Sequence, residues 1–215
     1  MARWESTASV ADRFGGCLLG LAVGDALGGP YEGLTSADIF FQFGTIDAII
    51  HNPSGDTLYF TDDTEMMIGV AETLIDCGSI NESRLCRAFV ENYHVERAYG
   101  QGARKVLDAM AQGKNWRKIA ETLFPGGSFG NGAAMRVAPI GLLFRDQLET
   151  LWEQARLSAL PTHTHPLGIE GAQLLAAAIA HASRVTTFSR REFYREMQSL
   201  ATTEEFRWHP TSRLN

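Results

Sequence analysis

The sequence predicts a single all-α domain. Apolar residues recur at helical spacing in almost every segment, whereas the strict alternation that is typical of half-buried strands is almost absent. The chain has 215 residues, of which 45% are hydrophobic, and this is enough for one continuous core. Because no internal repeat or low-complexity linker divides the chain, we expect one compact helical domain over residues 1–215.

Helix start and stop signals place the expected elements in order. The first helix is expected over Val10–Leu27. The second is expected over Thr61–Cys77 and ends before Gly78, because glycine favours the left-handed C-cap. Ser79 and Glu82 form a possible capping box for the next helix. Further helices are expected over residues 102–111, 116–124, 133–144, 147–160, 166–182 and 190–200, with short strand-like stretches at 48–50 and 58–60.

Composition excludes several classes of protein. The net charge is -6 and no Lys/Arg cluster is dense enough to follow a phosphate backbone, so direct nucleic-acid binding is not expected. No apolar run approaches the roughly 20 residues that span a bilayer, so no membrane partner is expected. Residues 14–23 resemble the apolar part of a signal peptide, but acidic residues occupy the flank that should be basic. Three cysteines without CxxC spacing predict reduced core thiols and a cytoplasmic location: Cys17, Cys77 and Cys86.

Glycines recur every four residues along the first expected helix. Each glycine inside a helix costs about 1 kcal/mol relative to alanine, so four of them indicate that something approaches this face closely. Tight packing of a neighbouring helix is the favoured explanation, and a bound ligand is the alternative. The residues are Gly16, Gly20, Gly24 and Gly28.

Two segments carry carboxylates that could bind a metal. Thr61, Asp62 and Asp63 begin a helix, where a hydroxyl and two carboxylates can gather the hard oxygen ligands that Mg²⁺, Mn²⁺ or Ca²⁺ prefer. The alternative is that these residues only cap the helix. Glu32 lies in a glycine-rich loop, where it could act as an acid/base group, bind a metal or be a solvated loop residue.

A second glycine-rich segment, residues 126–132, precedes a helix and could bind an anion such as a diphosphate, or be a plain turn. It also matches G-x-S-x-G, with Ser128, Asp146 and His163 in the chain order of an α/β-hydrolase triad. That fold requires a strand directly before the serine, which the sequence does not predict. His163 and His165 could bind zinc, but no further ligands occur at suitable spacing, so a pocket lining or a loop role is favoured.

Taken together, five segments resemble the ADP-ribosylglycohydrolase family, in particular the branch that acts on ADP-ribosylserine. They occur in the family's order and extend over nearly the whole chain. The segments are GCLLGLAVGDALGGPYEG, TDDTEMMIGVAETLI, RAYGQG, GGSFGNGAAMRVAP and LPTHTHPLGIEGA.

The resemblance implies a compact all-α fold, with two Mg²⁺ ions in a cleft that releases ADP-ribose from modified protein side chains. It implies metal binding by Glu32, Thr61, Asp62 and Asp63, of which the three carboxylates also take part in catalysis. It further implies an ADP-ribose-binding set made of Gly127, Ser128, Phe129, Gly130, Asn131 and His163.

The chain departs from the family pattern at its C-terminal end. The family supplies its remaining metal ligands from a D-x-D-[T/S] motif, but no aspartate follows Asp146 here. We therefore expect roughly the N-terminal two-thirds of the domain, without its last helices and with ligands for about one ion. Two hypotheses follow. The chain is a metal-dependent ADP-ribosyl hydrolase that turns over poorly as written, or it is a non-catalytic ADP-ribose-binding or crystallin-like relative.

Overall fold

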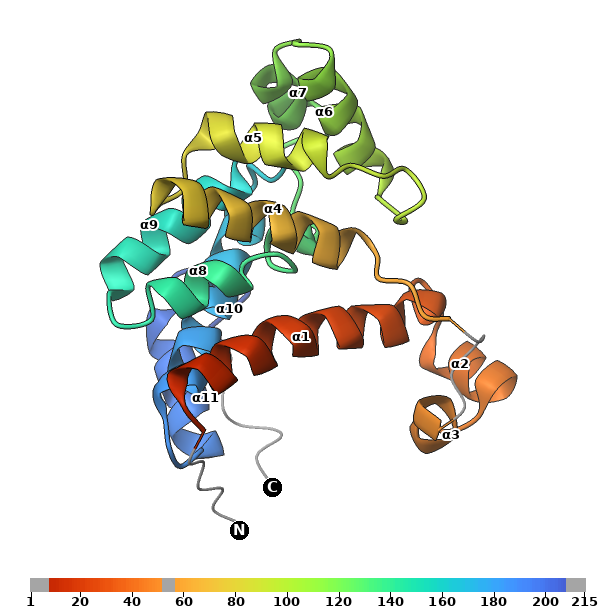
Figure 1. The fold of residues 1–215 in the computed structure, drawn as a ribbon, viewed down its shortest axis with the longest axis vertical. Coiled ribbons are helices and arrows are strands. Elements are labelled where there is room, and N and C mark those ends of the chain that lie inside the picture. The colour runs from red at the N-terminus through yellow and green to blue at the C-terminus, as the bar shows by residue number, and fades with distance from the viewer. Residues whose placement is uncertain (1–7, 52–56, 208–215) are drawn as a thin grey trace.

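The computed structural model describes residues 8–51 and 57–207, and these form an all-α fold with no strand in either range, as predicted (Figure 1). Eleven α-helices and two short 3₁₀ helices make up the described part. Their bounds are α1 Val10–Gly28, η1 Gly29–Tyr31, α2 Ser36–Phe43, α3 Ile46–His51, α4 Asp62–Cys77, α5 Glu82–Glu91, α6 Gln101–Ala111, α7 Trp116–Thr122, η2 Asn131–Ala133, α8 Ala138–Leu143, α9 Leu148–Ala159, α10 Pro166–Arg184 and α11 Arg190–Leu200.

Helix α10 lies at the centre of the fold, where it packs against α8, α9 and α11. Its buried face is rich in alanine, and small side chains let neighbouring helices approach closely. The closest approach is to α8, where a Cβ added to Gly141 would lie 2.6 Å from the carbonyl oxygen of Ala176. A larger residue at position 141 would therefore separate these two helices.

Helix α4 joins this core to the helices at the other end of the molecule. It packs against α5 and α8 and buries Met66, Val70 and Leu74. Its predicted ends are confirmed: Thr61 is the N-cap, and Gly78 adopts a left-handed conformation with φ +71°. Ile75 follows Leu74 and points about 100° away around the helix, and it is 81% exposed.

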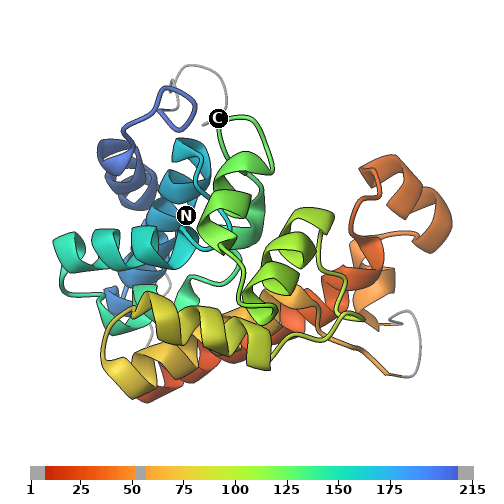
Figure 2. The same cartoon turned by 90° about the horizontal axis from the view of Figure 1, so that it is seen from above.

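Helix α1 runs beside α4, α8 and α10, and its far end carries α2 and α3 away from the rest of the fold (Figures 1 and 2). The four regularly spaced glycines do not support close packing in the described part of the chain. No atom lies within 4 Å of a Cβ built on Gly16, Gly20, Gly24 or Gly28. Within residues 8–51 and 57–207, neither a helix nor any other segment covers this glycine face.

Several predicted elements are wrong, for local reasons. The strand-like stretch 48–50 lies inside helix α3, and 58–60 is an irregular segment. The helix expected over 133–144 is broken, because the chain turns after η2 and α8 starts at Ala138 with Pro139 in its first turn. Helix α5 is capped by Asn81 instead of Ser79. Helix α2 was not anticipated, although Thr35 and Asp38 form a complete capping box for it.

The three cysteines are free thiols, as expected, but they are not all in the core. Cys86 is buried, Cys17 is partly buried and Cys77 is exposed at the end of α4. In the described ranges, no helix is long and apolar enough to cross a bilayer.

Candidate functional site

A pocket of about 290 Å³ opens beside the N-terminus of α4. That volume is at the lower end of the range for small-molecule sites. Segments that are far apart in the sequence meet there: the first turn of α4, the start of α6, the glycine-rich loop 126–132 and the segment before α10. Among the predicted site residues, those that line it are Asp62, Ser128, Gly130, Asn131 and His163.

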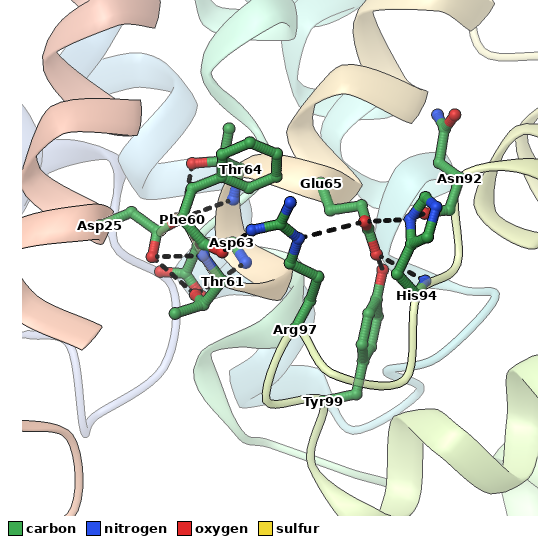
Figure 3. A network of polar contacts seen from close by, with 10 residues as sticks. All are labelled: Asp25, Phe60, Thr61, Asp63, Thr64, Glu65, Asn92, His94, Arg97 and Tyr99. Carbon is green, nitrogen blue, oxygen red and sulfur yellow. Dashed lines mark hydrogen bonds and ion pairs between the residues drawn. The ribbon is translucent and has the colours of Figure 1, made fainter. Parts of the chain in front are cut away.

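The first turn of α4 is held from outside the helix by Asp25 of α1 (Figure 3). The carboxylate of Asp25 accepts hydrogen bonds from the backbone N–H groups of Thr61 and Thr64, at 2.9 and 3.0 Å. It also accepts the hydroxyl hydrogens of both threonines, at 2.6 and 2.5 Å. Asp25 therefore satisfies donors that the start of a helix leaves unpaired, and it fixes the direction of the Thr61 hydroxyl.

Carboxylates are crowded around this turn. Burial, followed by repulsion from Glu32 and Asp25, raises the pKa of Asp62 to about 6. Burial and the repulsion of Asp25, Asp62 and Glu32 raise the pKa of Asp63 to about 7. Glu32 therefore lies within electrostatic reach of both aspartates, although Glu32 and Asp63 do not line the pocket itself. In the described part of the chain, no three His, Cys, Asp or Glu side chains lie close enough to form a complete metal site.

The raised pKa values predict how stability depends on pH. A carboxyl with a raised folded-state pKa contributes stability that is present below its unfolded pKa near 4 and is lost as the pH rises through its folded value. Asp63→Asn removes the charge, so it is expected to raise the melting temperature of the metal-free chain at pH 8 and to change it little at pH 5. Thermal denaturation of both proteins at the two pH values measures this difference. An equal effect at both pH values would show that neighbouring carboxylates do not repel the charge of Asp63.

Glu65 anchors the other side of the α4 terminus (Figure 3). This buried carboxylate accepts hydrogen bonds from the Tyr99 hydroxyl at 2.7 Å and from the His94 backbone N–H at 3.0 Å. Arg97 belongs to the same network. Its guanidinium donates a hydrogen bond to the carbonyl oxygen of Phe60 and lies over the Phe60 ring, 3.9 Å from the ring centroid. These contacts fix the segment that leads into the pocket-lining start of α6.

The loop 126–132 depends on glycine for its path. Gly126 and Gly127 have φ values of +79° and +89°, in the left-handed region. A Cβ added to Gly127 would lie 2.6 Å from the backbone nitrogen of His165, so this part of the loop rests directly on the segment before α10. Phe129 is 66% exposed, with its ring 5.1 Å from that of His165 and outside the pocket lining.

His163 lines the pocket and is itself buried. Its Nδ1 lies 2.8 Å from the Thr162 hydroxyl, which in turn accepts a hydrogen bond from Arg136. Burial, with a smaller contribution from the charge of Arg136, lowers the pKa of His163 to about 3. His163 is therefore a neutral imidazole at physiological pH.

The structure does not assemble a serine-hydrolase triad. Ser128 and His163 line the same pocket, but Asp146 does not, and its carboxylate is paired with its neighbour Arg145 at 3.2 Å. The segment before Ser128 is helix α7 and a turn, so no strand leads into the serine. The two histidines of the H-x-H pair have different roles. His163 lines the pocket, whereas Nδ1 of His165 accepts a hydrogen bond from the Leu167 backbone N–H and caps α10.

Three site residues were missed from the sequence: Asp25, Thr162 and Arg136. Asp25 carried a usable signal, since it is the one charged residue between Arg13 and Glu32, in an otherwise apolar and glycine-rich helix. Arg136 and Thr162 gave no comparable signal, because an arginine after an apolar stretch is ordinarily exposed and solvated.

The described residues form an all-α domain with a pocket lined by a carboxylate, a glycine-rich loop and a buried histidine, and comparison with known proteins identifies its family. A sequence profile described as ADP-ribosylglycohydrolase matches residues 6–214. The chain belongs to the ADP-ribosylglycohydrolase family.

Relatives and solved structures agree with this assignment. The chain is 34% identical over 184 residues to ADP-ribosylhydrolase ARH3 of Danio rerio, covering 83% of this chain and 50% of the relative. It is 33% identical to human ARH3, covering 78% and 49% of the two chains. An uncharacterized protein of Archaeoglobus fulgidus is 37% identical, with 86% and 60% covered.

A solved structure of an ADP-ribosylglycohydrolase-related protein complex superposes with a TM-score of 0.61 at 26% identity. The alignment covers 89% of this chain and 61% of the solved one. The chain thus spans 49–60% of the length of these three relatives.

Proposed function

We propose that this chain carries the ADP-ribose-binding part of a Mg²⁺-dependent hydrolase that removes ADP-ribose from modified protein side chains. The observation that carries the proposal is the shared pocket, which is lined both by Asp62 and by the glycine-rich loop at Ser128, Gly130 and Asn131. A carboxylate suited to a metal and a loop suited to an anionic group therefore line one cavity. Membership of the family and the names of the ARH3 relatives support the substrate class.

The donor set at the α4 terminus is suited to a hard divalent cation. Burial, together with repulsion from neighbouring carboxylates that include Glu32 and Asp25, raises the pKa values of Asp62 and Asp63, and a cation would relieve that repulsion. Thr61 gives its hydroxyl hydrogen to Asp25 and accepts the Asp63 backbone N–H at 3.4 Å, which leaves one lone pair of its oxygen available as a ligand. Thr61, Asp62, Asp63 and Glu32 would hold the ion, and bound Mg²⁺ would supply a Lewis acid.

The chain's own residues would bind and orient the substrate. Backbone N–H groups of the loop 126–132 would hold the diphosphate, since glycines let the backbone approach an anion closely. His163 would contact the adenosine end, and Phe129, which is exposed beside Ser128 in the same loop, would stack against the ligand. Glu32, on the loop after η1, would act in catalysis together with Asp62 and Asp63.

Calorimetry of the chain with ADP-ribose, with and without Mg²⁺, tests this proposal. We expect binding that Mg²⁺ strengthens. Asp62→Asn is expected to weaken Mg²⁺ binding at least tenfold, because it removes the carboxylate charge. The helix content should stay unchanged, since asparagine is also favoured at the start of a helix. Asp146→Asn serves as the matched control, because Asp146 lies outside the pocket and forms an exposed ion pair. It should change neither the Mg²⁺ affinity nor the ADP-ribose affinity. Absence of ADP-ribose binding to the folded wild-type chain would refute the proposal.

A second candidate is a non-catalytic ADP-ribose-binding protein. It is favoured because, in residues 8–51 and 57–207 of the ligand-free structure, no group of three His, Cys, Asp or Glu side chains is arranged to hold a metal ion. A turnover assay on ADP-ribosylated peptide separates the two, using this chain and a version extended with the C-terminal segment of a longer relative. Hydrolysis by the extended chain alone would support the enzyme and assign the missing ligands to that segment. Binding without hydrolysis by either would support the second candidate.

A further inference from the structure

Three buried side chains that line the pocket form a continuous hydrogen-bonded chain. Arg136 is fully buried, and Thr162 and His163 are 5% and 7% exposed. One guanidinium nitrogen of Arg136, Nη2, donates to the carbonyl oxygen of Ser158 at 2.7 Å and to Oγ1 of Thr162 at 2.9 Å. Oγ1 of Thr162 lies 2.8 Å from Nδ1 of His163.

The hydrogen atoms of this chain can be assigned from the donors available. Arginine carries only donors, so the contact with Arg136 makes Oγ1 of Thr162 an acceptor. The hydroxyl hydrogen of Thr162 then needs an acceptor of its own, and among the described residues Nδ1 of His163 is the one within reach. If Nδ1 carried a hydrogen instead, the buried hydroxyl hydrogen would have no partner, which is costly in a desolvated site. Nδ1 is therefore the acceptor, and the ring hydrogen is on Nε2.

The opposite edge of the imidazole faces the glycine-rich loop. A Cβ built on Gly132 would lie 2.6 Å from Cε1 and 3.1 Å from Nε2, and one built on Gly130 would lie 3.7 Å from Nε2, so the loop backbone lies directly beside this edge of the ring. No side chain or backbone group of the described residues forms a hydrogen bond with Nε2. His163 nevertheless lines the pocket together with Ser128 and Asn131. The N–H group is thus directed to a place where a ligand atom can accept it.

We propose that Arg136 and Thr162 are positioning residues that hold His163 as the Nε2–H tautomer, so that it offers ADP-ribose a single hydrogen-bond donor toward a phosphate or ribose oxygen. The lowered pKa of His163 agrees with this assignment, since a neutral ring carries one hydrogen only. The identity of the ligand rests on the proposed function, whereas the tautomer is a property of the ligand-free chain. In this arrangement His163 cannot accept a proton from substrate at Nδ1, because that nitrogen is already occupied.

Nitrogen-15 NMR of the histidine rings tests the tautomer without any ligand. We expect the long-range proton couplings of His163 to show the Nε2–H form in the wild-type chain, with the signals assigned by their loss in His163→Gln. Thr162→Val removes the hydroxyl but keeps the side-chain shape, and it should abolish the single-tautomer pattern. Thr162→Ser retains the hydroxyl and should preserve the pattern. A Nδ1–H form in the wild type, or an unchanged pattern in folded Thr162→Val, would overturn the inference.

Titration with ADP-ribose then tests the role of the donor. Thr162→Val is expected to lose about tenfold in affinity, with Thr162→Ser close to the wild type. His163→Gln, whose amide reaches the position of Nε2, should keep more affinity than His163→Asn, whose amide reaches only Nδ1. Equal affinity of these two variants, or of Thr162→Val and wild type, would contradict the positioning role. If the wild-type chain shows the expected tautomer but binds no ADP-ribose, the proposed function fails and the ligand part of the inference fails with it.

Discussion

Replacing Asp25 with alanine is expected to lower the free energy of unfolding by about 2–4 kcal/mol and to abolish Mg²⁺ binding. The carboxylate accepts hydrogen bonds from backbone and hydroxyl groups of both Thr61 and Thr64, so its loss leaves several partly buried donors unpaired. The Thr61 hydroxyl would also lose the partner that fixes its direction. Chemical denaturation measures the first effect and calorimetry with Mg²⁺ the second.

Asp38→Ala is the matched control for this variant. Asp38 accepts hydrogen bonds from the backbone N–H and hydroxyl of Thr35 in the capping box of α2, but this pair is exposed and does not line the pocket. Its replacement should cost about 1 kcal/mol or less and leave Mg²⁺ binding unchanged. A similar loss of stability in both variants, with metal binding retained in Asp25→Ala, would mean that Asp25 is only an ordinary helix cap.

Gly127→Ala is expected to destabilise the chain by about 2–4 kcal/mol and to reduce ADP-ribose binding more than tenfold. Two costs add at this position. The residue has φ +89°, which an L side chain rarely adopts, and the new Cβ would lie against the Thr164 hydroxyl and 2.6 Å from the backbone nitrogen of His165. The loop 126–132 would have to move away from the segment before α10, and its backbone N–H groups would move with it.

Gly113→Ala separates these two costs. Gly113 also has a positive φ, +65°, but no atom lies within 4 Å of the Cβ that would be added. It should therefore show only the conformational penalty, about 1 kcal/mol, with ADP-ribose binding unchanged. Thermal denaturation of both variants measures the loss of stability, and calorimetry measures ADP-ribose binding. Equal losses of stability would show that the loop tolerates the contact with Thr164.

Much of the helical framework could be predicted from local sequence. The ends of α4 follow from Thr61 and Gly78, since capping residues act within one turn of the helix they end. Predictions failed where local patterns were ambiguous. The apolar stretch 48–50 is too short to distinguish strand from helix, and the apolar pattern of 133–144 continues across the turn between η2 and α8.

Part of the candidate site could likewise be predicted from local sequence, and part could not. The sequence alone determined the family resemblance, the carboxylates of Asp62 and Asp63 and the glycine-rich loop, because these are short motifs whose chemistry lies in neighbouring residues. Only the tertiary structure decided that Asp25 holds the start of α4 and that Arg136 reaches His163 through Thr162. These contacts join residues that are 36 and 26 positions apart, so no local pattern encodes them. Their strength comes from burial, which makes an unpaired polar group costly, and burial exists only once the helices have packed.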